Sequence, residues 1–551
     1  MGRRARKRDK QRMVVIGSVA AAVVVATAAG VYAFVAEDDG GLAALTASEE
    51  EPEIPSGPPT AAETRKAAGK FLAAWSAGEI RRAAGLTDDR AAALEVLTSF
   101  REDAHVEKLD VTPSGKPKDG SLPFGVEARI VYEEQKGDWS YDSAVHVVRK
   151  KATGKVVVAW NPTILHPELK DGRTIETGEG GDPPLKALDR NGTEITKEQH
   201  PALSGVLADL RTRYGDEAGG EPGIETRVLD AEGEETGTTL LTLSEGEEGT
   251  LRTTLDLGLQ RAAEKAIADK GKAAVVAVKA STGEILAAAH EPADGFDTAF
   301  QGLYAPGSTM KVVTGAMLMD KGLAAPNEQH PCPKKFEYGH WPFHNDNHFE
   351  IKNGTFEQSF AASCNTAFIS QAPELDDDSL TKYARDVFGL GLNWQVGTTT
   401  MDGRVPVQSD AQMGASLIGQ GGVRMNPLNM ASVAATARTG TFHQPYLVSP
   451  DVDGRTLATA PRTMKPGTAA GLRQVMRTTA VSGTAAVPMS GMGGDFGAKT
   501  GSAEVMGQKK PNAWFTAYSG DLAAAAVVPA SGHGGENAGP VVRAVFDAST
   551  G

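Results

Sequence analysis

The first long apolar stretch of the chain covers residues 13–35 and contains no charged side chain. A run of this length, rich in Val and Ala, spans a bilayer when it is helical. Residues 1–12 contain seven Lys or Arg residues and one Asp. Because basic flanks stay in the cytoplasm, the pattern predicts a cytoplasmic tail, a single transmembrane helix in the cell membrane, and a chain that continues outside. A cleaved signal peptide is the alternative, although its apolar core is usually only about 7–15 residues long.

Two other stretches have few periodic apolar residues and many Gly and Glu residues. Residues 36–59 are acidic and interrupted by Pro, which is typical of an extended linker. Residues 169–249 are also rich in Gly and Glu, but 203–214 and 238–243 keep the pattern of short ordered elements. We therefore expect a spacer after the membrane segment and a small, weakly patterned region in mid-chain.

Residues 60–168 lie between these stretches and have the pattern of a compact α+β domain. Phe71, Leu72 and Trp75 belong to a segment with helical spacing. Strand-like runs follow, at 126–132, 141–149 and 156–160. No convincing catalytic group stands out in this segment, so a spacer or docking module is expected.

The part of the chain after about residue 250 contains a second apolar helix and a pair of strands. Pro306-Gly307 ends the preceding segment, so the apolar run 308–322 is predicted to be a buried helix that begins at Ser308. Further on, 498–504 and 512–518 have the alternating and aromatic pattern of paired strands. The whole chain is thus predicted to be a multidomain α+β protein.

The length and net charge of the chain limit the number of folding units and the kinds of partner that we expect. The 551 residues are enough for about two to four folding units. The whole chain carries a net charge of −14 and residues 1–12 carry +6, so the remainder carries −20. A body this acidic is not expected to bind nucleic acid.

Three short strings contain the side chains with the clearest chemistry. They are Ser308-Thr309-Met310-Lys311, Ser363-Cys364-Asn365 and Lys499-Thr500-Gly501. Together they supply a hydroxyl nucleophile, a lysine as its base, a second hydroxyl to relay a proton, an amide, and a cationic group for the substrate. Acyl transfer through a serine ester requires this set when no histidine takes part.

The spacing within the first string is informative. Residues three apart share a helix face, which places the Lys311 amine within reach of the Ser308 hydroxyl. Burial and the N-terminal end of the helix dipole both lower the pKa of Lys311 from its ordinary value of about 10.4, which makes the amine a better base. Capping of the helix by Ser308 is compatible with this role.

Each string also has an interpretation without catalysis. The second alone resembles a polar turn between helices, and the third alone resembles the end of a surface strand. Another Ser-x-x-Lys string, Ser379-Leu380-Thr381-Lys382, follows an acidic run and opens a helical pattern. Ser379 is therefore predicted to be a helix N-cap without a catalytic role. Catalysis is inferred from the three strings together.

Two cysteines and a group of histidines leave alternatives open. Outside the cell Cys332 and Cys364 could pair, and a crosslink would hold the second string; two separate thiols are the alternative. Four histidines lie in the same part of the chain: His330, His340, His344 and His348. Because Pro342 interrupts any helix that would align them, a polar loop beside the cleft is favoured over a metal site.

Residues from about 251 to the C-terminus resemble the penicillin-binding transpeptidase family. Besides the three strings, the resemblance rests on Leu-Arg-Thr-Thr-Leu-Asp-Leu-Gly-Leu-Gln at 251–260, Ala305-Pro306-Gly307-Ser308, Ile418-Gly419-Gln420-Gly421 and Asn426-Pro427-Leu428. Residues 60–168 resemble the nuclear transport factor 2-like domain of methicillin-resistance-type penicillin-binding proteins. Leu188-Asp189-Arg190-Asn191-Gly192 resembles the opening of the family's pedestal or dimerisation region, which looks shortened here to 169–249.

The resemblance implies a transpeptidase domain at 250–551, with an antiparallel sheet flanked by helices, and a role for each site residue. Ser308 would be the nucleophile, Lys311 its base, and Ser363 the proton relay to the leaving group. The backbone N–H groups of Ser308 and Ser502 would form the oxyanion hole. The residues implied in substrate binding are Asn365, Lys499, Thr500, Gly501 and Ser502. No cofactor and no metal are implied.

By the same resemblance, the chain is expected to be a class B D,D-transpeptidase that crosslinks peptidoglycan stem peptides and is acylated by β-lactams. A separate glycan-polymerising membrane enzyme is the expected partner. A D,D-carboxypeptidase or β-lactam hydrolase on the same scaffold is one alternative, but no Glu-x-x-Leu-Asn string lies between the second and third strings. A non-catalytic penicillin sensor is the other, and residues 1–12 are too short for a signalling domain.

Overall fold

The computed structural model describes residues 55–549. The predicted cytoplasmic tail, the transmembrane helix and most of the linker lie outside these residues. Within 55–549, no helix has both the length and the apolar character needed to cross a bilayer. The membrane segment therefore stays a prediction.

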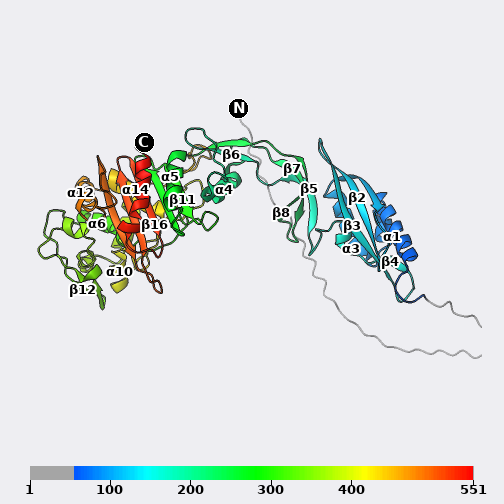
Figure 1. Cartoon of the computed structure of the whole chain (residues 1–551), viewed down its shortest axis with the longest axis horizontal. Helices are drawn as coiled ribbons and strands as arrows, with labels where there is room; N and C mark the ends of the chain where they lie inside the picture. The colour runs from blue at the N-terminus through cyan, green and yellow to red at the C-terminus, as the bar shows by residue number, and fades with distance from the viewer. Residues whose placement is uncertain (1–54, 550–551) are drawn as a thin grey trace, which may run out of the picture. The chain divides into compact units, whose positions relative to one another are not determined.

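The N-terminal domain combines three helices with a four-stranded antiparallel sheet in the order β1-β2-β3-β4 (Figure 1). Its elements are α1 (Ala61–Ser76), α2 (Ile80–Ala84), α3 (Arg90–Glu102), β1 (Val106–Pro113), β2 (Ser121–Tyr132), β3 (Gln135–Arg149) and β4 (Val156–Val158). Phe71, Leu72 and Trp75 are buried on α1, facing the core shared with the sheet. The predicted helix and the first two predicted strands are confirmed, and the third ends at Val158, before the predicted end at Trp160.

The middle region forms a three-stranded antiparallel sheet, a parallel strand pair and a helix. The sheet has the order β5-β7-β8, and the pair consists of β6 and β9. Their bounds, with the helix, are β5 (Thr174–Gly180), β6 (Leu185–Leu188), α4 (Ser204–Tyr214), β7 (Gly223–Leu229), β8 (Glu235–Ser244) and β9 (Gly249–Arg252). The ordered pieces predicted at 203–214 and 238–243 correspond to α4 and part of β8.

Contacts cross both predicted edges of this middle region. Ile175 of β5 is part of the apolar core of the N-terminal domain, and Leu241 of β8 packs against that core. On the other side, Lys186 of β6 pairs with Thr250 of β9, across the predicted start of the C-terminal domain. The middle region is therefore structurally continuous with both of its neighbours in sequence.

The C-terminal domain is built on a five-stranded antiparallel sheet in the order β11-β10-β16-β15-β14. The strands are β10 (Ala273–Lys279), β11 (Ile285–Glu291), β14 (Phe496–Ala503), β15 (Asn512–Ser519) and β16 (Leu522–Val528). Val275 and Ala277 of β10 join one apolar core, while Val276 and Val278 join another. Because successive side chains of a strand point to opposite faces, both faces of the sheet are covered.

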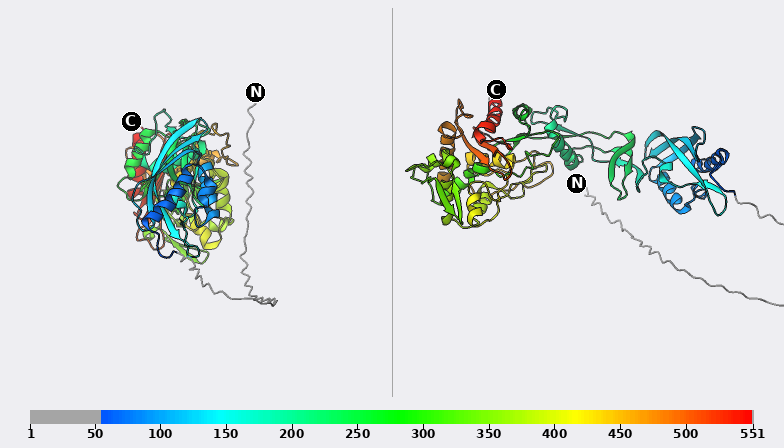
Figure 2. Two further views of the ribbon diagram at one scale, coloured as in Figure 1. Left: turned by 90° about the vertical axis from the view of Figure 1, so that its right-hand side faces the viewer. Right: turned by 60° about the horizontal axis from the view of Figure 1, so that its bottom comes forward.

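Helices from distant parts of the sequence cover this sheet (Figure 2). On one face lie α5 (Leu257–Ile267) and the C-terminal helix α14 (Gly539–Ala548). On the other face lie α6 (Lys311–Asp320) and α11 (Pro427–Thr439), whose apolar side chains are almost all buried. The first catalytic string is thus part of the domain core.

The third string occupies the edge strand of the sheet. β14 pairs with β15 on one side, with Lys499 opposite Thr516, and it ends the strand order on the other. The paired strands predicted at 498–504 and 512–518 are confirmed. An edge strand of this kind can bind an extended peptide through its free backbone groups.

Candidate active site

Ser308 lies in a tight turn that leads into α6. The turn is a 3-10 helix (Gly307–Met310), and the α-helix proper begins at Lys311. Gly307 has a φ of 53° and donates its N–H to the carbonyl oxygen of Gly419 at 2.9 Å. The predicted helix start at Ser308 is therefore correct to within one residue, but the first turn is 3-10 helical.

The side chain of Lys311 is completely buried, and its amine is surrounded by oxygen atoms. Nζ lies 3.0 Å from Ser308 Oγ, 2.8 Å from the Ser363 carbonyl oxygen and 2.7 Å from Asn365 Oδ1. Burial lowers the pKa of Lys311 well below its usual range, and the charge of Lys499 lowers it further. The amine is therefore well placed to take the proton of Ser308.

Ser363 connects two buried amines. Its Oγ lies 2.8 Å from Lys499 Nζ and 3.4 Å from Lys311 Nζ. Burial lowers the pKa of Lys499 to about 7. A hydroxyl between two such amines is suited to pass a proton to a leaving group, as predicted.

The second string is also the polar turn that its composition suggested. It joins α7 (Phe356–Ala361) to α8 (Thr366–Ile369), so the catalytic and the structural interpretations hold together. Ser363 has a φ of 60°. This left-handed conformation costs a residue with a side chain about 1–2 kcal/mol, so neighbouring groups have to hold the turn.

The third string contacts the turn that contains Ser308. A Cβ atom at Gly501 would lie only 2.8 Å from the carbonyl oxygen of Pro306, and one at Gly307 would lie 2.8 Å from that of Ser502. Glycine at both positions therefore permits this close approach. The structure thus brings the predicted site residues together: Ser308, Lys311, Ser363, Asn365, Lys499, Thr500, Gly501 and Ser502. The oxyanion role of the two backbone N–H groups stays a prediction.

Four residues around the site were not found from the sequence: Asn345, Gly419, Thr484 and His533. Thr484 Oγ1 lies 2.6 Å from Thr500 Oγ1, and His533 Nδ1 lies 3.4 Å from Ser502 Oγ. Gly419 belongs to a segment noted only for its family resemblance. The others reach the site from loops and helix ends, where no hydrophobic period marks them.

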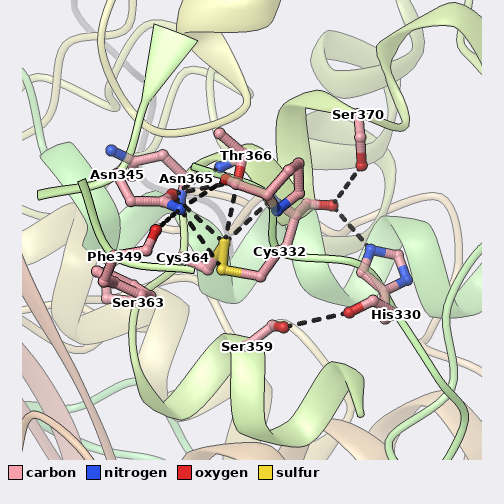
Figure 3. The surroundings of a disulfide bond; sticks show 12 residues. His330, Cys332, Asn345, Phe349, Ser359, Ser363, Cys364, Asn365, Thr366 and Ser370 are labelled. Atoms are coloured by element: carbon pink, nitrogen blue, oxygen red, sulfur yellow. Dashed lines mark hydrogen bonds between the residues drawn. A yellow bond between two sulfur atoms is a disulfide. The ribbon is translucent and has the colours of Figure 1, made fainter. Parts of the chain in front are cut away.

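Cys332 and Cys364 form a disulfide, with their Cα atoms 6.2 Å apart (Figure 3). The sequence left this pairing open because it contains no information on that distance. The bond ties the second catalytic string to the loop that precedes the hairpin of β12 (Lys335–Tyr338) and β13 (Trp341–His344).

The histidines near this disulfide have separate environments. His330 is buried, and its Nε2 lies 2.8 Å from the Ala367 carbonyl oxygen. The rings of His344 and His348 lie 4.6 Å apart beside the hairpin. Among residues 55–549, no three His, Cys, Asp or Glu side chains are grouped so that they could hold a metal ion.

The second Ser-x-x-Lys string has no catalytic surroundings. Ser379 is the first residue of α9 (Ser379–Phe388), and Asp378 is the N-cap. The predicted N-cap role of Ser379 is wrong, because its Oγ accepts the N–H of Asp376, ahead of the helix, at 3.1 Å. Lys382 is exposed and pairs with Asp378 at 2.7 Å, so Ser379 has no buried amine beside it.

Comparison with known proteins places this site in a family. Residues 273–547 match the model of the penicillin binding protein transpeptidase domain, and residues 63–173 match that of the NTF2-like N-terminal transpeptidase domain. The peptidoglycan D,D-transpeptidase PbpA of Mycobacterium tuberculosis strain H37Rv is 29% identical over 342 residues, which cover 50% of this chain and 67% of that protein.

Two solved structures share the fold. Pseudomonas aeruginosa PBP2 in complex with WCK 5153 is 22% identical with a TM-score of 0.54, covering 67% of this chain and 96% of that one. A chain from a peptidoglycan synthase complex is 22% identical with a TM-score of 0.51, covering 69% and 92%. The chain therefore belongs to the penicillin-binding transpeptidase family and carries an NTF2-like domain ahead of its transpeptidase domain.

Proposed function

We propose that this chain is a peptidoglycan D,D-transpeptidase. The observation that carries the proposal is the buried Lys311 amine, 3.0 Å from Ser308 Oγ. The family match and the mycobacterial relative described as a peptidoglycan D,D-transpeptidase support the same reaction.

In the acylation step, neutral Lys311 takes the proton of Ser308 as its Oγ attacks the carbonyl carbon between the two terminal D-alanines of a stem peptide. The backbone N–H groups of Ser308 and Ser502 hold the developing oxyanion, and one such donor contributes about 3–4 kcal/mol. The peptide bond breaks, an ester forms on Ser308, and D-alanine leaves.

Ser363 transfers the proton to the leaving amine. Its Oγ is suited to this because it contacts both Lys311 and Lys499 at hydrogen-bonding distance. Asn365 binds the donor peptide, and Lys499 with Thr500 binds its terminal carboxylate. The amine of a second stem peptide then attacks the ester, which forms the crosslink and restores the Ser308 hydroxyl.

A β-lactam would react by the first half of this sequence. Its strained amide carbonyl is attacked by Ser308, the ring opens, and the product remains attached as an ester. Because the opened ring does not leave, the site stays blocked.

The chain is further proposed to be anchored by residues 13–35, with its transpeptidase domain outside the cell membrane. The apolar run and the basic residues before it support this topology. A partner that polymerises glycan is also proposed; one protein of the same fold belongs to a peptidoglycan synthase complex that coordinates polymerization and crosslinking.

The test is incubation with a pentapeptide donor, with and without an acceptor amine, followed by mass analysis. Peptides joined to the acceptor with loss of D-alanine are expected from the natural chain, and neither joined nor trimmed peptides from Ser308→Ala. Trimmed donor alone, even at high acceptor concentration, would identify a carboxypeptidase instead. Equal activity in Ser308→Ala would refute the assignment of Ser308 as the nucleophile.

A further inference from the structure

Asn345 is completely buried, yet both ends of its amide are hydrogen-bonded. Its Oδ1 accepts the N–H groups of Asn365 at 2.8 Å and Thr366 at 3.0 Å. Its Nδ2 donates to the carbonyl oxygens of Pro333 at 2.9 Å and Phe349 at 2.8 Å (Figure 3). One side chain therefore connects the loop around the β12–β13 hairpin to the turn 363–366.

That turn contains two residues of the active site and is held in an unfavourable conformation. Ser363 adopts a φ of 60°. A residue with a side chain keeps such a conformation only where its surroundings enforce it. Two consecutive N–H groups that converge on Asn345 Oδ1 fix the orientation of the backbone directly after Cys364.

The same loop also holds the side chain of Asn365. Asn365 Nδ2 donates to the carbonyl oxygen of His344 at 3.1 Å, while its Oδ1 accepts a hydrogen bond from Lys311 Nζ at 2.7 Å. Residues 344 and 345 therefore determine where the Asn365 amide lies relative to the catalytic lysine. A small rotation of the turn would also move Ser363 Oγ away from Lys499 Nζ, which lies at 2.8 Å.

The disulfide restrains the same turn in a different way. Cys332 and Cys364 keep the two segments attached, and Cys364 Sγ lies 3.4 Å from Asn345 Oδ1. The disulfide limits the distance between the two segments, whereas the hydrogen bonds to Asn345 Oδ1 set the direction of the N–H groups of Asn365 and Thr366. The disulfide therefore keeps the segments together when Asn345 is changed.

We propose that Asn345 is a positioning residue for acyl transfer at Ser308. It does not touch the reacting atoms and acts through the turn 363–366. The inference rests on the proposed function, since it concerns the rate at which Ser308 is acylated.

The test compares Asn345→Ala, Asn365→Ala and the double variant, each purified with the disulfide intact. The second-order rate constant of acylation by a fluorescent penicillin is measured for each. Misplacement of reacting groups by about an ångström costs up to about a hundredfold in rate, so we expect a loss of about tenfold to a hundredfold in Asn345→Ala. Because both residues act through one arrangement, the double variant should lose far less than the product of the two single losses.

Asn426→Ala is the matched control. Asn426 is equally buried and donates to the carbonyl oxygens of Phe300 at 2.6 Å and Met401 at 2.8 Å, at the start of α11. Its loss should lower the melting temperature while the folded protein is acylated within about twofold of the natural rate. When Asn426→Ala is combined with Asn365→Ala, the acylation rate should fall by no more than the product of the two single losses.

Two results would overturn the inference: acylation of Asn345→Ala at the natural rate, or a double-variant loss equal to the full product. If Asn345→Ala does not fold, Asn345→Ser, which keeps a small donor and acceptor, is judged by the same two criteria. Failure of the proposed function looks different, because the natural chain would then not join a donor peptide to an acceptor amine, whatever its rate of acylation.

Discussion

At the scale of single residues, the site depends on two buried lysines with different tasks. The pKa of Lys311 is lowered by burial and by the charge of Lys499, whereas burial alone lowers that of Lys499. Lys311, whose amine lies 3.0 Å from Ser308 Oγ and whose pKa is lowered by both effects, serves as the base. Lys499 keeps its charge for the substrate carboxylate until the pH approaches about 7.

This difference predicts a bell-shaped pH profile for the second-order rate constant of acylation, which reports groups of the free enzyme. The rate should rise with pH as Lys311 becomes neutral. It should then fall as Lys499 loses its charge at a pH of about 7. Stopped-flow acylation across the pH range measures both limbs.

Lys499→Arg tests the assignment of the falling limb. A guanidinium does not lose its proton in this range, so the fall near neutral pH should disappear even where the overall rate is lower. A natural enzyme whose rate rises without a fall up to pH 9 would contradict the role of Lys499.

The sequence predicted the site residues that lie in the three short strings, but it did not predict those that lie outside them. The spacing of Ser308 and Lys311 predicted their contact, since one helical turn brings them together. Asn345 could not be found, because its role depends on a loop that returns to the turn 363–366. Ser379 was misassigned as an N-cap, because a local pattern does not show whether a helix begins one residue earlier.

At the scale of secondary-structure elements, the Ser308 turn depends on a backbone contact with the loop after α10 (Asp410–Ser416). The carbonyl oxygen of Gly419 accepts the N–H of Gly307 at 2.9 Å. A Cβ atom at Gly419, where φ is 73°, would lie 2.0 Å from the carbonyl oxygen of Gly307. The turn can keep its position only with glycine at 419.

Gly419→Ala is therefore expected to destabilise the protein and to slow acylation together. The positive φ alone costs about 1–2 kcal/mol, and the overlap with Gly307 adds about 1–3 kcal/mol. Urea unfolding and the acylation rate measure the two effects. We expect at least about a tenfold loss of rate, because the clash displaces the residue next to the nucleophile.

Gly391→Ala is the control for the backbone conformation. Gly391 has a φ of 76°, and a Cβ atom there would have no neighbour within 4 Å. This variant should lose only the free energy of unfolding that the positive φ costs an alanine, about 1–2 kcal/mol, and it should keep its acylation rate. Equal behaviour of the two variants would show that the contact at Gly307 does not matter.

The elements themselves were predictable where the pattern was strong, and their arrangement was not. Strands 498–504 and 512–518 are confirmed as β14 and β15, since apolar alternation and a short connection specify them. The order of the strands in the sheet could not be predicted, because neighbouring strands are far apart in the sequence. For example, Ala274 of β10 pairs with Val527 of β16.

At the scale of the whole molecule, the domain boundaries are less sharp than composition suggests. Ile175 and Leu241 belong to the region rich in Gly and Glu, yet they pack with the N-terminal core. Low hydrophobicity over a long window concealed these few apolar residues. Similarly, β6 and β9 form a parallel pair from segments on either side of the predicted boundary.

The membrane anchor is a prediction at this scale. The full chain, expressed in a bacterium, should sediment with membranes and resist extraction by high salt, because 23 uncharged residues are enough to span the bilayer. A chain that lacks residues 1–35 should appear in the soluble fraction. Recovery of the full chain from the soluble fraction, uncleaved, would contradict the anchor.

The most direct test of the account is the site of the covalent bond. The purified protein is incubated with benzylpenicillin, digested, and mapped by mass spectrometry. We predict one adduct of the mass of the antibiotic, located on Ser308 and absent from Ser308→Ala. An adduct on any other residue, or one that persists in Ser308→Ala, would contradict the assignment of the nucleophile.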